Sequence, residues 1–185
     1  MILDDSEVEI RAPGRADLPA LARFAAAVPQ HDLLFLTRDI REPRVLDAWI
    51  EGVEAGEIDS LAALSSGEIV ATVACVSDRL SWSRHVWDIR LLVAESHRNM
   101  GLGRALLERA IARCCARGAT KLTARMTPDQ TGAITLFEEC GFRAEAMLRD
   151  QVIDSTGRTH DLAVLAMHPS AEAARRAAFE ERALP

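Results

Sequence analysis

The chain has 185 residues, of which 49% are hydrophobic, and a formal net charge of -6. This length and composition allow one sizeable hydrophobic core, so we expect a single domain over residues 1–169 and a helical or frayed tail over residues 170–185. The acidic balance argues against a general affinity for nucleic acid, which clusters of Lys and Arg drive, so no nucleic-acid partner is expected.

No apolar run is long enough to cross a membrane, and residues 1–5 lead into acidic residues rather than into an apolar signal segment. We therefore expect a cytoplasmic protein with no membrane partner. The four cysteines fit neither a zinc spacing nor a disulfide framework, which predicts reduced side chains and no bound metal. They are Cys75, Cys114, Cys115 and Cys140.

The first half of the chain predicts short elements separated by turn residues. They are a strand over residues 8–11, helices over residues 17–27 and 43–56, and strands over residues 60–65 and 69–77. Ser66 and Gly67 join the last two strands as an antiparallel hairpin. Residues 30–42 have no clear period but contain an apolar cluster, so they form either a loop packed on the core or a wall of a substrate pocket.

The central stretch joins a strand directly to a helix. Apolar residues alternate over residues 85–93, and helical spacing returns over residues 101–117. The connection, residues 97–104, reads His-Arg-Asn-Met-Gly-Leu-Gly-Arg. Gly101 and Gly103 let the backbone approach a ligand closely, and the first helical amides point outward with the positive end of the helix dipole behind them. This turn would hold a pyrophosphate; the simpler alternative is a tight turn alone.

Two other nucleotide-binding motifs do not match this turn. A dinucleotide fingerprint needs a third glycine where Leu106 stands, and a P-loop needs Gly-Lys-Ser/Thr.

The rest of the chain predicts a strand over residues 121–126, a helix from Thr127 to Gly141, and strands over residues 144–154 and 160–167. Thr127 as N-cap, Pro128 at the first helical position and Gln130 as the capping-box partner mark the start of this helix. The element order predicts an α/β (α+β) fold with a mixed central sheet of about seven strands and about four flanking helices. The strand at 85–93 and the strand at 121–126 should be parallel, through a right-handed crossover.

The motifs resemble those of the GNAT superfamily of N-acetyltransferases. Arg98 to Gly103 matches the family's Arg/Gln-x-x-Gly-x-Gly/Ala coenzyme A signature, and residues 132–142 look like its second signature, Ala-x-x-Leu-Tyr/Phe-Glu-x-x-Gly-Phe. The element order agrees over about residues 7–168. The resemblance implies a GNAT-like acyl-CoA N-acyltransferase fold. It also implies transfer of an acetyl group from acetyl-CoA to a primary amine by direct attack in a ternary complex.

The resemblance further implies how the coenzyme is held. Backbone amides of the turn would bind the pyrophosphate, and the central strand would pair with the pantetheine arm where it splays from the strand at 121–126. Amides near Leu92 and Val93 would polarise the thioester carbonyl. The implied coenzyme-binding residues are Leu91, Leu92, Val93, Arg98, Asn99, Met100, Gly101, Leu102, Gly103, Arg104, Gln130 and Phe137.

The acid and the base are less well defined. The family's usual acid is a Tyr at the position of Phe137, and the chain has no Tyr. Ser, water or Cys140 would have to replace it, or the thiolate, with a thiol pKa of about 8.5, would leave unaided. A carboxylate base in part of the family falls on Arg125 here, so the candidates are Asp88 and then His85.

Asp88 has a simpler interpretation, an ion pair with Arg90 two residues away on the same face of the strand. The histidines His31, His160 and His168 have no partner visible in the sequence and are expected at the surface.

The acceptor side is expected to include Phe35, Asp39 and Trp82, because the loops that carry them border the acceptor in the resembling family. Asp39 would suit a cationic amine. The rival hypothesis is a coenzyme-binding sensor or partner-binding module with weakened chemistry. A homodimer would be compatible with an exposed strand edge.

Overall fold

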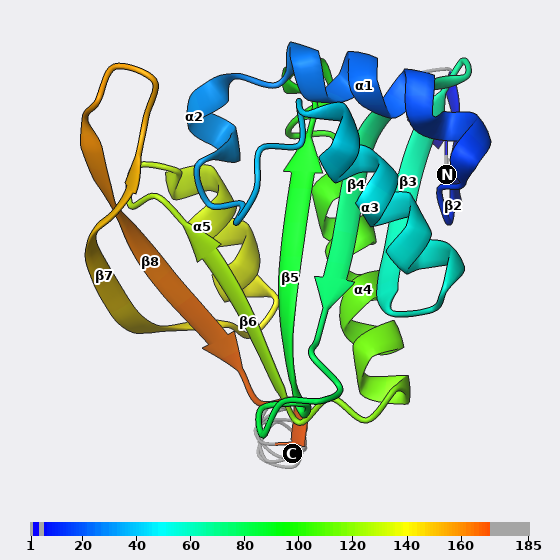
Figure 1. Ribbon diagram of the computed structural model, residues 1–185. Helices are drawn as coiled ribbons and strands as arrows, with labels where there is room; N and C mark the ends of the chain where they lie inside the picture. Colours follow the sequence, from blue (N-terminus) through cyan, green and yellow to red (C-terminus); the bar gives the residue numbers. More distant parts are fainter. Residues whose placement is uncertain (1, 4–5, 171–185) are drawn as a thin grey trace, which may run out of the picture.

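The computed structural model describes residues 2–3 and 6–170, which form one twisted sheet covered by helices (Figure 1). The predicted tail, apart from Ser170, lies outside the described residues. The eight described strands are β1 (Ile2–Leu3), β2 (Ser6–Arg11), β3 (Ile58–Ser65), β4 (Glu68–Val76), β5 (Val86–Val93), β6 (Lys121–Met126), β7 (Arg143–Ile153) and β8 (Thr159–Met167).

The described helices are α1 (Leu18–Ala27), α2 (Gln30–Leu33), α3 (Pro43–Glu54), α4 (Leu102–Ala116) and α5 (Thr131–Glu139). The strand order is β1-β2-β3-β4-β5-β6-β8-β7. Only the β5–β6 pair is parallel within the described sheet, and α4 makes the crossover between these two strands. The predicted mixed sheet is thus confirmed, with β1 and α2 as short additions.

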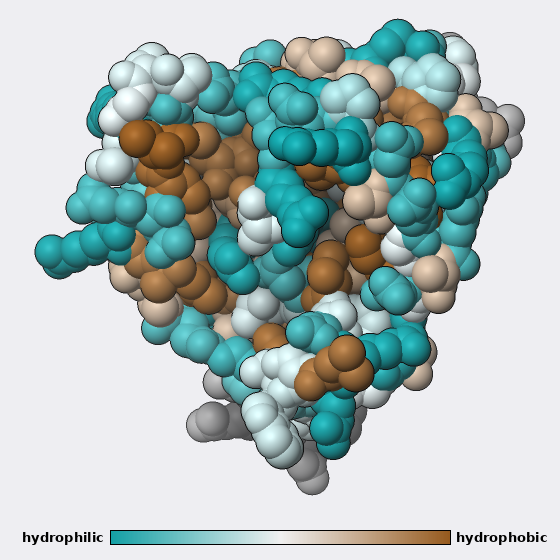
Figure 2. All heavy atoms as spheres, viewed as in Figure 1, coloured by the Kyte–Doolittle hydropathy of each residue, from teal (hydrophilic) through white to brown (hydrophobic). Residues whose placement is uncertain are grey.

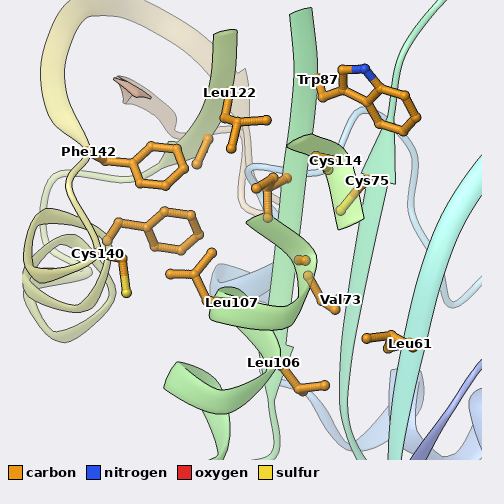
Figure 3. Packing of buried hydrophobic residues seen from close by; sticks show 14 of the residues in the cluster. Leu61, Val73, Cys75, Trp87, Leu106, Leu107, Cys114, Leu122, Cys140 and Phe142 are labelled. Atoms are coloured by element: carbon orange, nitrogen blue, oxygen red, sulfur yellow. The ribbon is translucent and has the colours of Figure 1, made fainter. Parts of the chain in front are cut away.

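The sheet is buried on both faces by separate groups of side chains. Leucines of α4 pack against β4, β5 and β6 on one face, while α1 and α3 cover β3 and β4 on the other (Figure 1). In Figure 3, Leu122 of β6 lies beside Phe142, and Leu107 of α4 belongs to the same buried cluster. Leu102, Leu106 and Leu107 are fully buried, because they recur at the spacing that places them on one side of a helix.

The cysteines behave as reduced residues of a packed interior. Cys75 and Cys114 are buried and point toward each other from β4 and α4 (Figure 3). Contact with the Cys114 thiol and burial hold the pKa of the Cys75 thiol well above its usual range, so it remains a neutral thiol. Cys140 is buried as well, whereas Cys115 is exposed.

The structure corrects the start of one helix. The helix expected from Thr127 begins at Thr131, and residues 127–130 close a turn of their own. The Thr127 N–H donates to Gln130 Oε1 over 3.1 Å, and the Gln130 N–H donates to the Thr127 carbonyl over 3.0 Å. The capping-box pairing of Gln130 with the Thr127 amide therefore forms, but it stabilises a turn rather than the first turn of the helix.

Residues 30–42 are only partly irregular. They contain α2, whose Leu33 is buried in the group of side chains under α1 and α3. Within residues 2–3 and 6–170, no helix is both long and apolar enough to cross a membrane.

Candidate active site

The turn between β5 and α4 has the backbone geometry of an anion cradle. Asn99 and Gly101 have φ angles of 61° and 78°, in the left-handed region that favours glycine. The first backbone hydrogen bond of α4 is donated by the Ala105 N–H to the Gly101 carbonyl over 3.0 Å. The N–H groups of Leu102, Gly103 and Arg104 therefore have no acceptor within the helix and are available to an anion.

The two glycines of this turn serve different purposes. A Cβ on Gly101 would meet no atom within 4 Å, so the space before it is open to a ligand. A Cβ on Gly103 would lie 3.2 Å from Leu136 Cδ2 and 3.5 Å from Val93 Cγ2, so Gly103 lets α5 pack closely against the start of α4. One glycine thus shapes the cradle and the other supports it.

Beside this turn, β5 and β6 separate. Their parallel pairing covers only Val86 to Asp88 against Lys121 to Thr123, although β5 continues to Val93. The Ala94 N–H donates to the Val70 carbonyl on β4, and the His85 carbonyl accepts from the β6 side. The backbone N–H and C=O groups of successive residues in a strand point toward opposite neighbouring strands. Leu91 and Val93 therefore direct these groups into the opening, whereas Leu92 directs them toward β4. This opening is the splay expected from the resemblance.

A cavity of about 620 Å³ combines the turn and the opening. Ten of the twelve residues expected to bind coenzyme line it, namely Leu91, Leu92, Val93, Arg98, Asn99, Gly101, Gly103, Arg104, Gln130 and Phe137. Met100 and Leu102 do not line it, and the Leu102 side chain is fully buried in the core. These two residues belong to the turn through their backbone.

Ion pairs tie the rim of the cavity together. The Arg98 guanidinium donates to Asp32 Oδ2 of α2 over 2.6 Å and to the Val93 carbonyl over 3.2 Å. Arg104 pairs with Glu139, which links α4 to α5. All four side chains line the cavity. The contact between Asp32 and Arg98 therefore attaches the short helix α2 to the cradle and holds the Arg98 guanidinium in place.

His31 is a cavity residue that the sequence did not reveal. Its Nε2 lies 2.8 Å from Asp129 Oδ2 and 3.2 Å from Thr127 Oγ1. Burial alone would raise the pKa of Asp129, but contacts with Thr127 and His31 outweigh it and hold that pKa below its usual range. His31 therefore has two partners that the sequence did not show, although its side chain is 37% exposed. The expectation of a surface residue holds for His168, which is exposed.

The expectation of a surface residue is wrong for His160, which is partly enclosed. Its Nε2 lies 2.7 Å from Asp154 Oδ2, its side chain is 15% exposed, and its ring stands edge-on to the His31 ring with centroids 5.4 Å apart. The sequence gave no sign of the His31 contacts, because Thr127 lies 96 residues away from His31 along the chain.

The two predicted base candidates do not line the cavity. Asp88 accepts from Arg90 Nε over 2.9 Å and has Arg125 Nε at 3.8 Å, and it does not line the cavity. The ion pair with Arg90 is the simpler interpretation given above. His85 is exposed before the start of β5, at the opposite end of that strand from the cradle. Arg125, in contrast, does line the cavity.

The three predicted acceptor residues are not brought together. Phe35 lines the cavity. Asp39 is exposed and pairs with Arg41 over 2.6 Å, while Trp82 is 95% exposed in the loop before β5. Neither Asp39 nor Trp82 is among the residues that line the cavity.

Phe137 stands at the position where a tyrosine acid would be expected. It is buried, with 3% of its surface exposed, and its ring meets Phe142 edge-on at a centroid distance of 5.0 Å. This residue therefore contributes to packing at the floor of the cavity and offers no proton.

The fold and the cavity match a known class of enzymes. The model of the Acetyltransferase (GNAT) family matches residues 27–142, more than half of the chain. The chain therefore belongs to the acetyltransferase (GNAT) family, whose members carry out acetyl-CoA-dependent N-acetylation. No curated protein matches the chain.

Solved structures share the fold at low sequence identity. A GNAT-family acetyltransferase from Streptococcus pneumoniae is 22% identical with a TM-score of 0.75, over 88% of this chain and 99% of that one. The protein yncA from Salmonella typhimurium, solved with its cofactor acetyl-CoA, is 21% identical with a TM-score of 0.74, over 88% and 94%. The ribosomal-protein-S18-alanine N-acetyltransferase from Escherichia coli is 18% identical with a TM-score of 0.69, over 88% and 94%.

The residues of the cavity suit the parts of acetyl-CoA. Unpaired amides at the start of α4 suit a pyrophosphate, and the open space before Gly101 leaves room for it. The backbone groups that Leu91 and Val93 direct into the opening suit an extended arm that contains amides, because such an arm can pair with β5 as an added strand would. Among residues 2–3 and 6–170, no cluster of three or more His, Cys, Asp or Glu side chains is arranged to hold a metal ion.

Proposed function

We propose that this chain transfers an acetyl group from acetyl-CoA to a primary amine by direct attack in a ternary complex. The observation that carries the proposal is one cavity that contains both the anion cradle and the opening between β5 and β6. Acetyl-CoA supplies the acetyl thioester. The amine nitrogen attacks its carbonyl carbon, a C–N bond forms, the C–S bond breaks, and the leaving thiolate takes the electron pair.

The backbone of β5 would stabilise the charge that develops on the carbonyl oxygen. The Val93 N–H faces the opening, whereas the Leu92 N–H faces β4, so Val93 is the better of the two expected donors. The thiolate needs little help, because a thiol pKa of about 8.5 makes it a tolerable leaving group near neutral pH. The absence of a tyrosine at Phe137 is therefore compatible with catalysis.

The amine must lose a proton, and we propose that His31 takes it. His31 lines the cavity, and Asp129 holds its ring in place and would stabilise the imidazolium that forms. Asp88, the first candidate from the sequence, has less support, because it pairs with Arg90 over 2.9 Å and lies outside the cavity lining.

The kcat/KM values of single variants separate these candidates. His31→Gln should lower kcat/KM by about 10²-fold or more, while acetyl-CoA affinity is retained. His168→Gln, at an exposed histidine outside the cavity, is the matched control and should behave like the unmodified chain. An unchanged kcat/KM in His31→Gln, together with a loss of about 10²-fold in Asp88→Asn, would reassign the base to Asp88.

The rival function, a coenzyme-binding sensor, is favoured by one observation, the packed Phe137 in place of a proton donor. A thiol-release assay over a broad panel of amines, together with acetyl-CoA calorimetry, distinguishes the two. Thiol release that depends on an amine supports the transferase. Tight coenzyme binding with no amine-dependent release over the panel would favour the sensor.

A further inference from the structure

Arg125 lines the cavity near the point where β5 and β6 separate. Leu122, Ala124 and Met126 are buried on the α4 side of β6, so the alternating Arg125 points to the opposite face. Its side chain lines the cavity and is 38% exposed. The pairing of the two strands ends at Asp88 and Thr123, two residues before Arg125 along β6. An arginine thus stands beside the opening through which an amine would reach the thioester.

Near Arg125, two arginines share one carboxylate. The β5–β6 register pairs Asp88 with Thr123, so its continuation would place Arg90 across the opening from Arg125. The Asp88 carboxylate lies between them, 2.9 Å from Arg90 Nε and 3.8 Å from Arg125 Nε. One carboxylate therefore faces two guanidinium groups, and Arg90 is the closer partner. Figure 2 shows hydrophilic residues over the centre of this face, whereas hydrophobic residues gather over β7 and β8.

The other arginines of the cavity have closer carboxylate partners. Arg98 lies 2.6 Å from Asp32, and Arg104 pairs with Glu139. For the terminal nitrogens of Arg125, the described part of the chain provides no hydrogen-bond acceptor. A guanidinium with its planar end unpartnered binds a carboxylate or a similar oxyanion through two parallel hydrogen bonds.

Arg125 also lies next to the proposed proton acceptor. Arg125 and Thr127 are two residues apart along β6 and its extension, which spaces them by about 6.6 Å. The Thr127 hydroxyl contacts His31 Nε2 over 3.2 Å. A cation that could hold an oxyanion and a histidine that could accept a proton from an amine are therefore neighbours on one wall.

We infer that the acceptor is an amine that also carries a carboxylate or similar oxyanion, as an α-amino acid does, and that Arg125 binds this group. The inference rests on the proposed function, because it names the acceptor class of the same site. Asp88, 3.8 Å from Arg125 Nε, faces the inner edge of the guanidinium and leaves its outer edge to the substrate. A cationic acceptor, which Asp39 had suggested, has less support, because Asp39 pairs with Arg41 outside the cavity lining.

The test compares L-amino acids with the amines that remain after loss of their carboxylate, for example L-phenylalanine with 2-phenylethylamine and L-leucine with isoamylamine. Thiol release gives kcat/KM for each pair, and calorimetry gives acetyl-CoA affinity. We expect the amino acid to exceed its decarboxylated partner by about 10- to 100-fold in kcat/KM, the effect of a charge-assisted hydrogen-bonded pair. Arg125→Gln should abolish this preference mainly through KM, with acetyl-CoA affinity and melting temperature unchanged.

Two further variants sharpen the comparison. Arg125→Lys should retain part of the preference, because it keeps the charge and loses the planar fork. Arg109→Gln removes an exposed arginine of α4 outside the cavity lining and should leave the preference intact.

Three results would overturn the inference. Acetylation of the decarboxylated amines as fast as the amino acids would refute the acceptor class while leaving the transferase function in place. A preference that survives Arg125→Gln would remove Arg125 from the site. Absence of thiol release with every amine and amino acid, despite acetyl-CoA binding, would defeat the inference together with the proposed function.

Discussion

The ion pair between Asp32 and Arg98 should weaken acetyl-CoA binding. Asp32 lines the cavity, is 19% exposed, and holds the Arg98 guanidinium at 2.6 Å. A coenzyme phosphate that recruits Arg98 must displace this carboxylate or share the cation with it, and the two anions repel each other. A partly exposed ion pair contributes about 0.2–1 kcal/mol, so replacing Asp32 by Asn should tighten acetyl-CoA binding by up to about fivefold.

Calorimetry on Asp32→Asn and on Asp39→Asn measures this effect. Asp39 also pairs with an arginine, but it lies outside the cavity lining, so its variant should bind acetyl-CoA like the unmodified chain. The gain from Asp32→Asn should shrink as salt is raised from about 0.1 M to 1 M, because the screening length falls from about 10 Å to about 3 Å. Weaker binding by Asp32→Asn would refute this reasoning and show that Asp32 orients Arg98 for the coenzyme.

Two further predictions concern stability. Asp59 is 5% exposed and accepts hydrogen bonds from Arg113 over 2.6 Å and Arg117 over 3.1 Å, so Asp59→Asn should lower the free energy of unfolding by about 1–3 kcal/mol in urea titrations; an effect below about 0.5 kcal/mol would contradict a structural role for this carboxylate. The hydrogen bond from Arg11 holds the pKa of Asp17 below its usual value. The contribution of Asp17 to folding stability is therefore complete above about pH 4 and is lost as the pH falls further. Asp17→Asn should therefore show a smaller loss of stability between pH 5 and 3 than the unmodified chain, and equal losses would contradict this assignment.

The period of the apolar residues was enough to predict the strands of the sheet and the main helices that cover it. It succeeded because buried residues recur at the spacing of their element, as Trp87 and Ile89 do in β5 and as the leucines do in α4. It failed at Thr127, where the residues typical of a helix start close a separate turn first. The sequence of such a turn and that of an N-terminal cap are alike, since both pair a side chain with a nearby amide.

The candidate site was predictable where it is local. The cradle lies within residues 97–104, so its glycines and helix start can be seen together in the sequence. His31 and Arg125 could not be assigned in this way, because their roles depend on contacts between distant segments. The alternation of β6 shows that Arg125 faces away from the buried side, but no pattern shows that β5 parts from β6 after Asp88.

Acetyl-CoA binding by calorimetry tests the central claim most directly, with Gly101→Glu compared with Gly67→Glu. Both glycines have positive φ angles, 78° and 82°, and open space at the Cβ position, so the two variants carry similar backbone strain. Only Gly101→Glu places a negative side chain in the cradle. We predict that acetyl-CoA binds the unmodified chain and Gly67→Glu alike, and that binding is lost in Gly101→Glu while its circular-dichroism spectrum is unchanged. Equal binding by all three proteins would contradict the cradle as the coenzyme site, and no binding by the unmodified chain would contradict the proposed function itself.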